Sequence, residues 1–146
     1  MQRNLEQILN SILHSSEILE EEMKQESDLK NLTSKQLNCI ELIKSMQNPS
    51  LTELAEKMKI AKASISVMID RLEKNKYIYK VSSDNDRRTV HVHLTEEGEK
   101  AASLHSELHK RISLLLTEEM TESEKEILIV LLNKSIKSLT KKRHIN

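Results

Sequence analysis

Apolar and polar residues alternate along most of this chain with the period of an α-helix, and residues 61–75 show the clearest case. Their apolar side chains fall on one stripe, formed by Ile65, Met68, Ile69 and Leu72. The outward face carries small or polar groups with few acids among them. Its members are Lys62, Ala63, Ser64, Ser66, Val67 and Arg71. A helix with such an outward face suits the major groove of DNA.

Two short strand patterns follow this helix. Residues 77–82 are rich in β-branched and aromatic residues, and residues 89–94 alternate between apolar and polar positions. The turn between them carries two adjacent arginines, Arg87 and Arg88. A helix-turn-helix followed by a two-stranded ribbon with a basic tip is the outline of a winged helix-turn-helix. The pattern therefore predicts a DNA-binding protein.

Side-chain caps mark where the helices begin. In a capping box, each of two side chains accepts a hydrogen bond from the backbone N–H of the other residue, three positions away. This spacing is met by Thr33 with Gln36, Ser50 with Glu53, and Thr121 with Glu124, while Thr95, followed by two glutamates, is a further start. With the apolar periodicity, these signals predict helices at about 4–27, 34–47, 51–58, 62–75, 95–118 and 122–142, and strands at about 77–82 and 89–94.

The charges are unevenly distributed, although the formal net charge of the chain is zero. Residues 57–88 hold 9 basic and 4 acidic side chains. The segments on either side are acidic, with 5 basic and 10 acidic side chains in residues 1–56 and 4 and 9 in residues 89–133. The internal region of positive charge thus coincides with the proposed reading helix and wing. Local positive potential supplies sequence-independent affinity for DNA by releasing counterions from phosphates.

Length and composition set further limits. A chain of 146 residues has the usual length of a single domain. Because only 1% of its residues are aromatic, its core must be built from Leu, Ile, Val and Met. No apolar run approaches the ~20 residues of a membrane span, and the start of the chain has no signal-peptide pattern. We therefore expect a soluble cytoplasmic protein with no membrane partner. No nucleophile elbow, phosphate loop or paired-carboxylate motif is present, so an enzyme is not expected.

The outer helices indicate self-association. Their apolar stripes comprise Leu5, Ile8, Leu9, Ile12, Leu13, Leu19 and Met23 in the first helix; Ala101, Leu104, Leu108, Ile112, Leu115 and Leu116 in the fifth; and Ile127, Leu128, Val130, Leu131, Leu132, Ile136 and Leu139 in the sixth. A helix that is apolar over more than one face must be enclosed. A homodimer is predicted, with a monomeric core as the alternative. Two-fold symmetry would place two reading helices about 34–36 Å apart on a pseudo-palindromic site.

Five short segments, in this order along the chain, resemble the MarR family of bacterial transcriptional regulators. They match the family's second helix, third helix, recognition-helix end, wing and strand-to-helix junction. The segments are Leu32-Thr33 with Gln36, Leu51-Thr-Glu-Leu-Ala55, Ile69-Asp-Arg-Leu-Glu-Lys74, Asp86-Arg87-Arg88 and Leu94-Thr-Glu-Glu-Gly98. The last of them holds the only glycine of the chain, where the family pattern expects one.

This resemblance implies a mainly α fold with a small β-hairpin, forming a single MarR-type domain over residues 1–146. Residues 33–94 would be the winged helix-turn-helix, and residues 1–30 and 95–146 would supply dimerisation helices. The family usually represses promoters and releases DNA when an effector binds or a cysteine is oxidised. The expected partners are therefore double-stranded DNA, a second copy of the chain and a small-molecule effector.

The resemblance also assigns DNA contacts by position. The residues expected to read bases are Lys62, Ala63, Ser64, Ser66 and Val67, the last through apolar contact with a thymine methyl group. In the wing, Arg88 is expected to enter the minor groove, with Asp86 orienting the wing through a salt bridge with an arginine. Contacts to phosphates are expected from Arg87, Lys80 and Lys74. The turn after the reading helix lacks the family's common glycine, and Asn75 is expected to take the left-handed cap there.

Two features suggest sensing. His105 and His109 lie four residues apart on one helix, a spacing suited to two metal ligands, and Glu107 and His14 could join them. Zinc-sensing members of the family use second-helix positions that hold Leu37 and Asn38 here. We therefore expect no metal cofactor and solvated or interface histidines, and keep a zinc-responsive regulator as an alternative.

Cys39 lies inside the second helix, and the expectation for it is a buried structural thiol, with a reactive thiol as the alternative.

A further alternative concerns the function as a whole. The winged helix could serve protein–protein contact without DNA, which would predict a neutral reading helix and wing. The basic balance of residues 57–88 argues against that interpretation.

Overall fold

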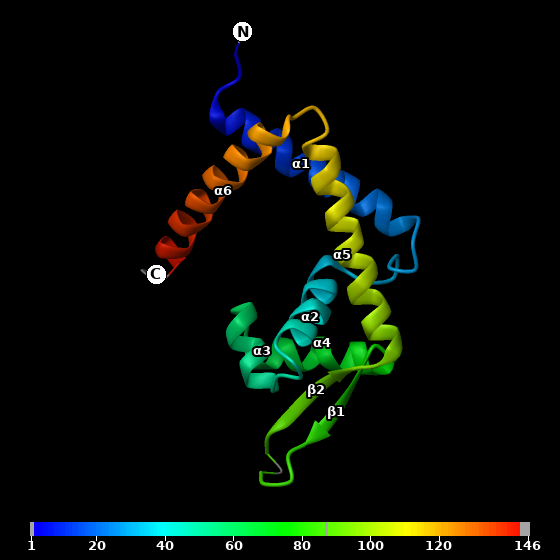
Figure 1. Ribbon diagram of the computed structural model, residues 1–146. Coiled ribbons are helices and arrows are strands. Elements are labelled where there is room, and N and C mark those ends of the chain that lie inside the picture. Colours follow the sequence, from blue (N-terminus) through cyan, green and yellow to red (C-terminus); the bar gives the residue numbers. More distant parts are fainter. Residues whose placement is uncertain (1, 87, 144–146) are drawn as a thin grey trace. The chain divides into compact units, whose positions relative to one another are not determined.

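The structure is a computed structural model, and it describes residues 2–86 and 88–143 (Figure 1). These residues form six helices and two strands, and every boundary lies within two residues of its predicted position. The helices are α1 (Leu5–Gln25), α2 (Ser34–Ser45), α3 (Leu51–Met58), α4 (Lys62–Lys74), α5 (Glu96–Leu116) and α6 (Glu122–Arg143), and the strands are β1 (Ile78–Ser82) and β2 (Val90–Leu94). The predicted mainly helical fold with one hairpin is confirmed.

The chain divides into two compact units, one ending at Lys110 and the other beginning at Arg111, so the division falls inside α5. In the first unit β1 and β2 pair antiparallel, in a register that runs from Ile78 opposite Leu94 to Ser82 opposite Val90. The segment before α3 extends this small sheet on the other side of β2. There the backbone N–H of Val92 donates to the carbonyl of Pro49 over 2.9 Å.

The core of the first unit is aliphatic, as the composition predicts. The apolar stripe of α4 is confirmed, because Ile65, Ile69 and Leu72 are fully buried and Met68 is half-buried. These side chains belong to one cluster that also draws on α2, α3, both strands and α5. The other fully buried aliphatic members are Leu29, Leu32, Leu37, Ile40, Ile43, Leu54, Ile78 and Val92. Burial of each such side chain contributes about 1.5–3 kcal/mol, so the cluster fixes which face of α4 remains outside.

Reciprocal caps fix the starts of several helices. The predicted capping boxes of Thr33 with Gln36 and Ser50 with Glu53 are present at α2 and α3, and that of Thr121 with Glu124 precedes α6. A further box, Asn4 with Gln7, begins α1 and was not predicted, although asparagine caps a helix as well as serine does. Hydrogen bonds from the Ser50 backbone and side chain lower the pKa of Glu53, so this cap stays ionised to a lower pH than an ordinary glutamate would.

The turn after α4 corrects one prediction. Lys76, with φ of 65°, takes the left-handed conformation, whereas Asn75 has φ of −85°. The N–H of Tyr77 donates to the carbonyl of Leu72, and the N–H of Lys76 donates to that of Glu73. This hydrogen-bond pattern is a Schellman motif, which places the left-handed residue one position beyond the helix cap. Since Asn75 is the cap itself, the strained position falls on Lys76.

Gly98 lies where the start of α5 packs on the turn between α4 and β1. A Cβ atom at this position would lie 2.1 Å from the carbonyl oxygen of Tyr77 and 3.2 Å from the side chain of Leu94. Thr95 also binds the start of α5 to this turn, because its N–H donates to the Tyr77 carbonyl and its hydroxyl donates to the Lys76 carbonyl over 2.6 Å. The only glycine of the chain is therefore required by close backbone approach.

The second unit contains the end of α5 and α6. Seven large apolar residues on α6 are exposed in a single chain, on more than one face of the helix, whereas Leu128 is half-buried. The exposed residues are Ile127, Ile129, Val130, Leu131, Leu132, Ile136 and Leu139. No helix among the described residues is long and apolar enough to span a bilayer.

We expect Gly98→Ala to lower the free energy of unfolding by about 1–3 kcal/mol, because the added methyl group meets backbone that cannot move away cheaply. Intrinsic helix propensity alone would make the alanine variant more stable by about 1 kcal/mol. A loss of stability therefore indicates steric overlap, and a gain indicates helix propensity. Urea unfolding followed by circular dichroism measures it. Ser103→Ala, at an exposed position of the same helix, is the control and should leave stability nearly unchanged. A Gly98→Ala protein as stable as the wild type would refute the close approach.

Cys39 is fully buried in the core, and this burial raises the pKa of its thiol to about 12. The group is therefore a neutral thiol at physiological pH, as expected for a structural cysteine. We expect a disulfide exchange reagent such as DTNB to leave the native protein almost unlabelled and to label one thiol per chain in urea. Rapid labelling of the native protein would contradict this assignment.

Candidate nucleic-acid interface

The turn between α3 and α4 sets the direction of the reading helix. Lys59 ends α3 in the left-handed conformation, with φ of 53°, and the N–H of Ile60 donates to the carbonyl of Ala55 over 3.1 Å. The buried Leu54 of α3 and Ile65 of α4 belong to the same core cluster. The two helices are thus locked together by a short turn and a shared apolar contact, as a helix-turn-helix requires.

The outward face of α4 carries all five residues predicted to read bases. Lys62, Ala63 and Ser64 are exposed in its first turn, and the side chain of Val67 is 53% exposed one turn later. Ser66 is half-buried, and its hydroxyl donates to the carbonyl of Lys62 over 2.9 Å. Its oxygen lone pairs remain available to accept a hydrogen bond from an amino group of adenine or cytosine.

The N-terminus of α4 is built differently from those of α1, α2 and α3. Its N-cap residue is Ala61, which has no side chain that can accept a hydrogen bond from the first turn. The first backbone N–H groups of the helix are left for solvent or for a bound acceptor. Together with the exposed ammonium group of Lys62, they favour an anion such as a DNA phosphate at this end of the helix.

Asp86 organises the described part of the wing through local hydrogen bonds. Its carboxylate accepts hydrogen bonds from the backbone N–H of Arg88 over 2.9 Å and from the hydroxyl of Thr89 over 3.1 Å. No salt bridge joins Asp86 to the exposed side chain of Arg88 in the described part of the chain. Short acidic side chains commonly bond the backbone two residues further along the chain, as Asp86 does here. Arg87 lies outside the described residues.

The two lysines predicted to contact phosphates differ in their surroundings. Lys80 on β1 pairs with Asp70 and Glu73 of α4, with an Nζ to Oε1 distance of 3.6 Å for Glu73. The hydrogen bond to Asp70 is the main cause that raises the pKa of Lys80. This pair fastens the wing to the reading helix and partly neutralises the lysine. Lys74 is exposed and forms no salt bridge with any described residue, so its charge remains available to DNA.

The hairpin carries one cross-strand pair that sequence reasoning missed. Tyr79 and His93 are register partners, and their rings stack with centroids 5.1 Å apart. The alternation in β2 predicts that His91 and His93 face solvent or DNA, but it cannot identify a stacking partner on β1. Cross-strand aromatic pairs stabilise a hairpin by about 0.2–1 kcal/mol. The stack therefore stiffens the base of the wing that presents Arg88.

Comparisons with known proteins agree with this geometry. A model of the MarR family matches residues 32–90. An HTH-type transcriptional regulator of Bacillus cereus is 34% identical over 115 residues, covering 77% of this chain and 75% of its own length. The HTH-type transcriptional repressor MdtR of Bacillus subtilis is 26% identical over 130 residues, 83% of this chain and 84% of its own. The crystal structure of Streptococcus pneumoniae FabT in complex with DNA superposes with a TM-score of 0.86, at 25% identity, over 94% of this chain and 96% of that one.

We expect Arg88→Ala to weaken binding to specific DNA about tenfold with little loss of fold, since a specific arginine contact is worth about 1–3 kcal/mol and the residue is exposed. Fluorescence anisotropy at fixed salt measures the affinity. Lys100→Ala removes one positive charge from α5, away from the wing, and is the control for charge alone. Equal affinities for Arg88→Ala and the wild type would reject the wing assignment.

Proposed function

The chain belongs to the MarR family of transcriptional regulators, and on this premise we propose that it is a homodimeric repressor that binds a pseudo-palindromic promoter site and leaves it when an effector binds. Members of this family regulate transcription and are not enzymes. The observation that carries the proposal is the exposed face of α4, small and polar, next to a wing that presents Arg88. The relative that bears the name of a repressor supports the sign of regulation.

Dimerisation is supported by apolar surface that a single chain leaves open. On α1, the side chain of Leu5 is 81% exposed and Ile8, Leu9, Ile12 and Leu13 are exposed with it. On α6, the side chain of Leu139 is 68% exposed, in a helix whose apolar residues occupy more than one face. Monomeric proteins rarely present apolar patches of this extent, and a second copy of the chain is the occupant we propose. Its two-fold axis would relate two reading helices and hence two half-sites.

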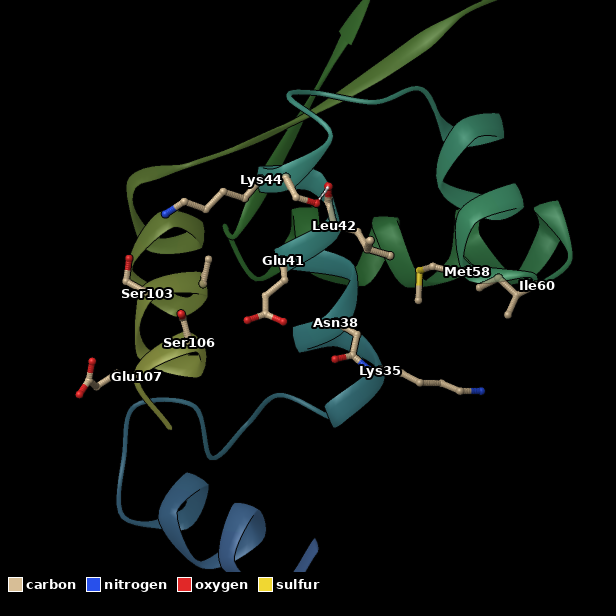
Figure 2. Close-up of a pocket in the computed structure, with 12 residues that line it drawn as sticks. Lys35, Asn38, Glu41, Leu42, Lys44, Met58, Ile60, Ser103, Ser106 and Glu107 are labelled. Carbon is tan, nitrogen blue, oxygen red and sulfur yellow. Dashed lines mark hydrogen bonds between the residues drawn. The ribbon is translucent and has the colours of Figure 1, made fainter. Parts of the chain in front are cut away.

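Effector binding is supported by a cavity of about 940 Å³ lined by residues of α2, α3 and α5. Figure 2 shows the side chain of Leu42 extending towards Met58, while the carboxylate of Glu41 lies between α2 and α5. Ile60 and Ala102 add apolar lining, and polar and charged groups surround it. A cavity of this size, in which four apolar side chains lie among eight polar or charged residues, suits a small organic molecule that carries polar groups. Because α2 and α3 belong to the winged helix-turn-helix, a ligand here could alter the position of α4.

The test is fluorescence-anisotropy binding to the DNA upstream of the protein's own gene, against scrambled competitor, across a salt series. Tight binding that resists competitor and weakens steeply with salt would establish a sequence-specific regulator. The same assay then screens small molecules for release from DNA. Weak binding that is equal for the upstream and scrambled DNA, repeated with genomic fragments selected by the protein, would contradict the proposal. It would favour a winged helix that contacts a protein partner.

We expect Leu139→Glu to raise the dissociation constant of the homodimer by roughly tenfold or more, because two-fold symmetry introduces the buried charge twice. Specific DNA binding should fall with it, since two linked half-sites bind more tightly than one. Sedimentation equilibrium and anisotropy measure the two effects. Ser138→Glu, a neighbouring position on the same helix, is the matched control for added charge. A wild-type chain that is monomeric at micromolar concentration would refute the dimer.

A further inference from the structure

We propose that Glu20, His105 and His109 form a binding site for a divalent transition-metal ion of the zinc class. The proposal does not rest on the proposed repressor function, because none of these residues belongs to the DNA interface. Glu20 lies on α1, and the two histidines lie one turn apart on α5. Each residue offers one ligand atom, and the three atoms lie within 4.8 Å of one another. Neither His14 nor Glu107, which the sequence had suggested as additional ligands, belongs to this cluster.

The distances suit a tetrahedral ion. Oε1 of Glu20 lies 3.3 Å from Nε2 of His105 and 3.9 Å from Nε2 of His109. Zinc binds imidazole nitrogen and carboxylate oxygen at about 2.0–2.2 Å, so two ligands on a tetrahedron lie roughly 3.4 Å apart. The first separation is near that value, and the second is somewhat longer. The side chains need only small adjustments to hold an ion, and the fourth position would be filled by water or another donor.

The burial of His105 points to a ligand more strongly than the spacing does. Its side chain is fully buried within a single chain, which corrects the expectation of a solvated or interface histidine, and its Nδ1 has no hydrogen-bond partner among the described residues. The nearest charged group on that side is the carboxylate of Glu41 on α2, whose Oε1 lies 3.2 Å from Nδ1 without hydrogen-bond alignment. A ring nitrogen buried without a partner is costly unless the ring serves another purpose. A metal on Nε2 would leave Nδ1 as the ring N–H, a donor that could bond the Glu41 carboxylate once the two side chains turn into alignment.

This arrangement has the two shells of a protein metal site. Glu20 and the two Nε2 atoms would contact the ion, and Glu41 would orient His105 from behind, as carboxylates commonly orient ligating histidines. Imidazole and carboxylate donors suit Zn²⁺ and its neighbours in the transition series better than Ca²⁺ or Mg²⁺. His109 is about half-exposed, which gives an ion a route to the cluster from solvent. The bound ion would join α1 to α5 and, through Glu41, engage α2 and a wall of the cavity.

The full-length protein, stripped of metal with a chelator, would be titrated with Zn²⁺ in competition with a chromophoric chelator. We expect one ion per chain and a higher melting temperature when the ion is present, since a ligand that binds only the folded state stabilises it. Co²⁺ replaces Zn²⁺ as a spectroscopic probe, and intense visible absorption would report a tetrahedral site. His105 is fully buried and its removal could unfold the chain, so the variants are made at the other two ligands.

His109→Ala and Glu20→Gln should each weaken Zn²⁺ binding at least tenfold and abolish the zinc-dependent rise in melting temperature. Glu41→Gln should weaken binding while retaining the Co²⁺ spectrum, because Glu41 does not contact the ion. The matched controls are His91→Ala on β2 and Glu107→Gln on α5, and both should bind like the wild type. Binding well below one ion per chain, or wild-type affinity in His109→Ala and Glu20→Gln, would overturn the site. Either result leaves the DNA-binding measurements unaffected.

Discussion

Burial of the apolar stripe of α4 is the constraint on which the DNA interface depends. Ile65, Ile69 and Leu72 lie in the core with Leu54 of α3 and Val92 of β2, and none of these side chains retains solvent exposure. A rotation of the helix that exposed this stripe would lose several kcal/mol of hydrophobic stabilisation. The opposite face is consequently held outside, with no specific contact needed to keep it there. Small and polar residues on that face then cost the fold little and remain available for recognition.

The wing depends on the same core but is attached by weaker contacts. The pair between Lys80 and Asp70 is partly exposed, and such a pair contributes at most about 1 kcal/mol. Backbone hydrogen bonds add geometric constraints, with β2 bound to β1 on one side and to the Pro49 carbonyl on the other. Gly98 allows α5 to close on the turn that precedes β1. The base of the hairpin is therefore rigid, whereas its tip is held chiefly by local hydrogen bonds around Asp86.

The sequence was sufficient for features that local chemistry determines. Helix periodicity, capping boxes and the buried stripe all depend on residues three or four positions apart, and the structure confirms them. Contacts between distant residues could not be obtained in this way. Lys80 pairs with Asp70 across a turn, and His105 contacts Glu20, which lies 85 residues earlier in the chain on α1. Neither pair has a characteristic sequence separation, so a single sequence does not reveal it. The left-handed Lys76 could have been found, because it follows from counting positions in a Schellman motif.

One helix connects the features that regulation would have to link. The first turn of α5 packs on the base of the wing through Thr95 and Gly98, and the next two turns present Ala102 to the cavity and His105 to the acidic groups of α1 and α2. An α-helix rises about 1.5 Å per residue, so along α5 the wing contact lies within roughly 10 Å of the cavity residue, and the cavity residue within roughly 10 Å of His105. A helix transmits displacement along its length because its hydrogen bonds resist local deformation. An effector in the cavity and a metal ion at His105 would therefore act on the same element, and that element directly supports the wing.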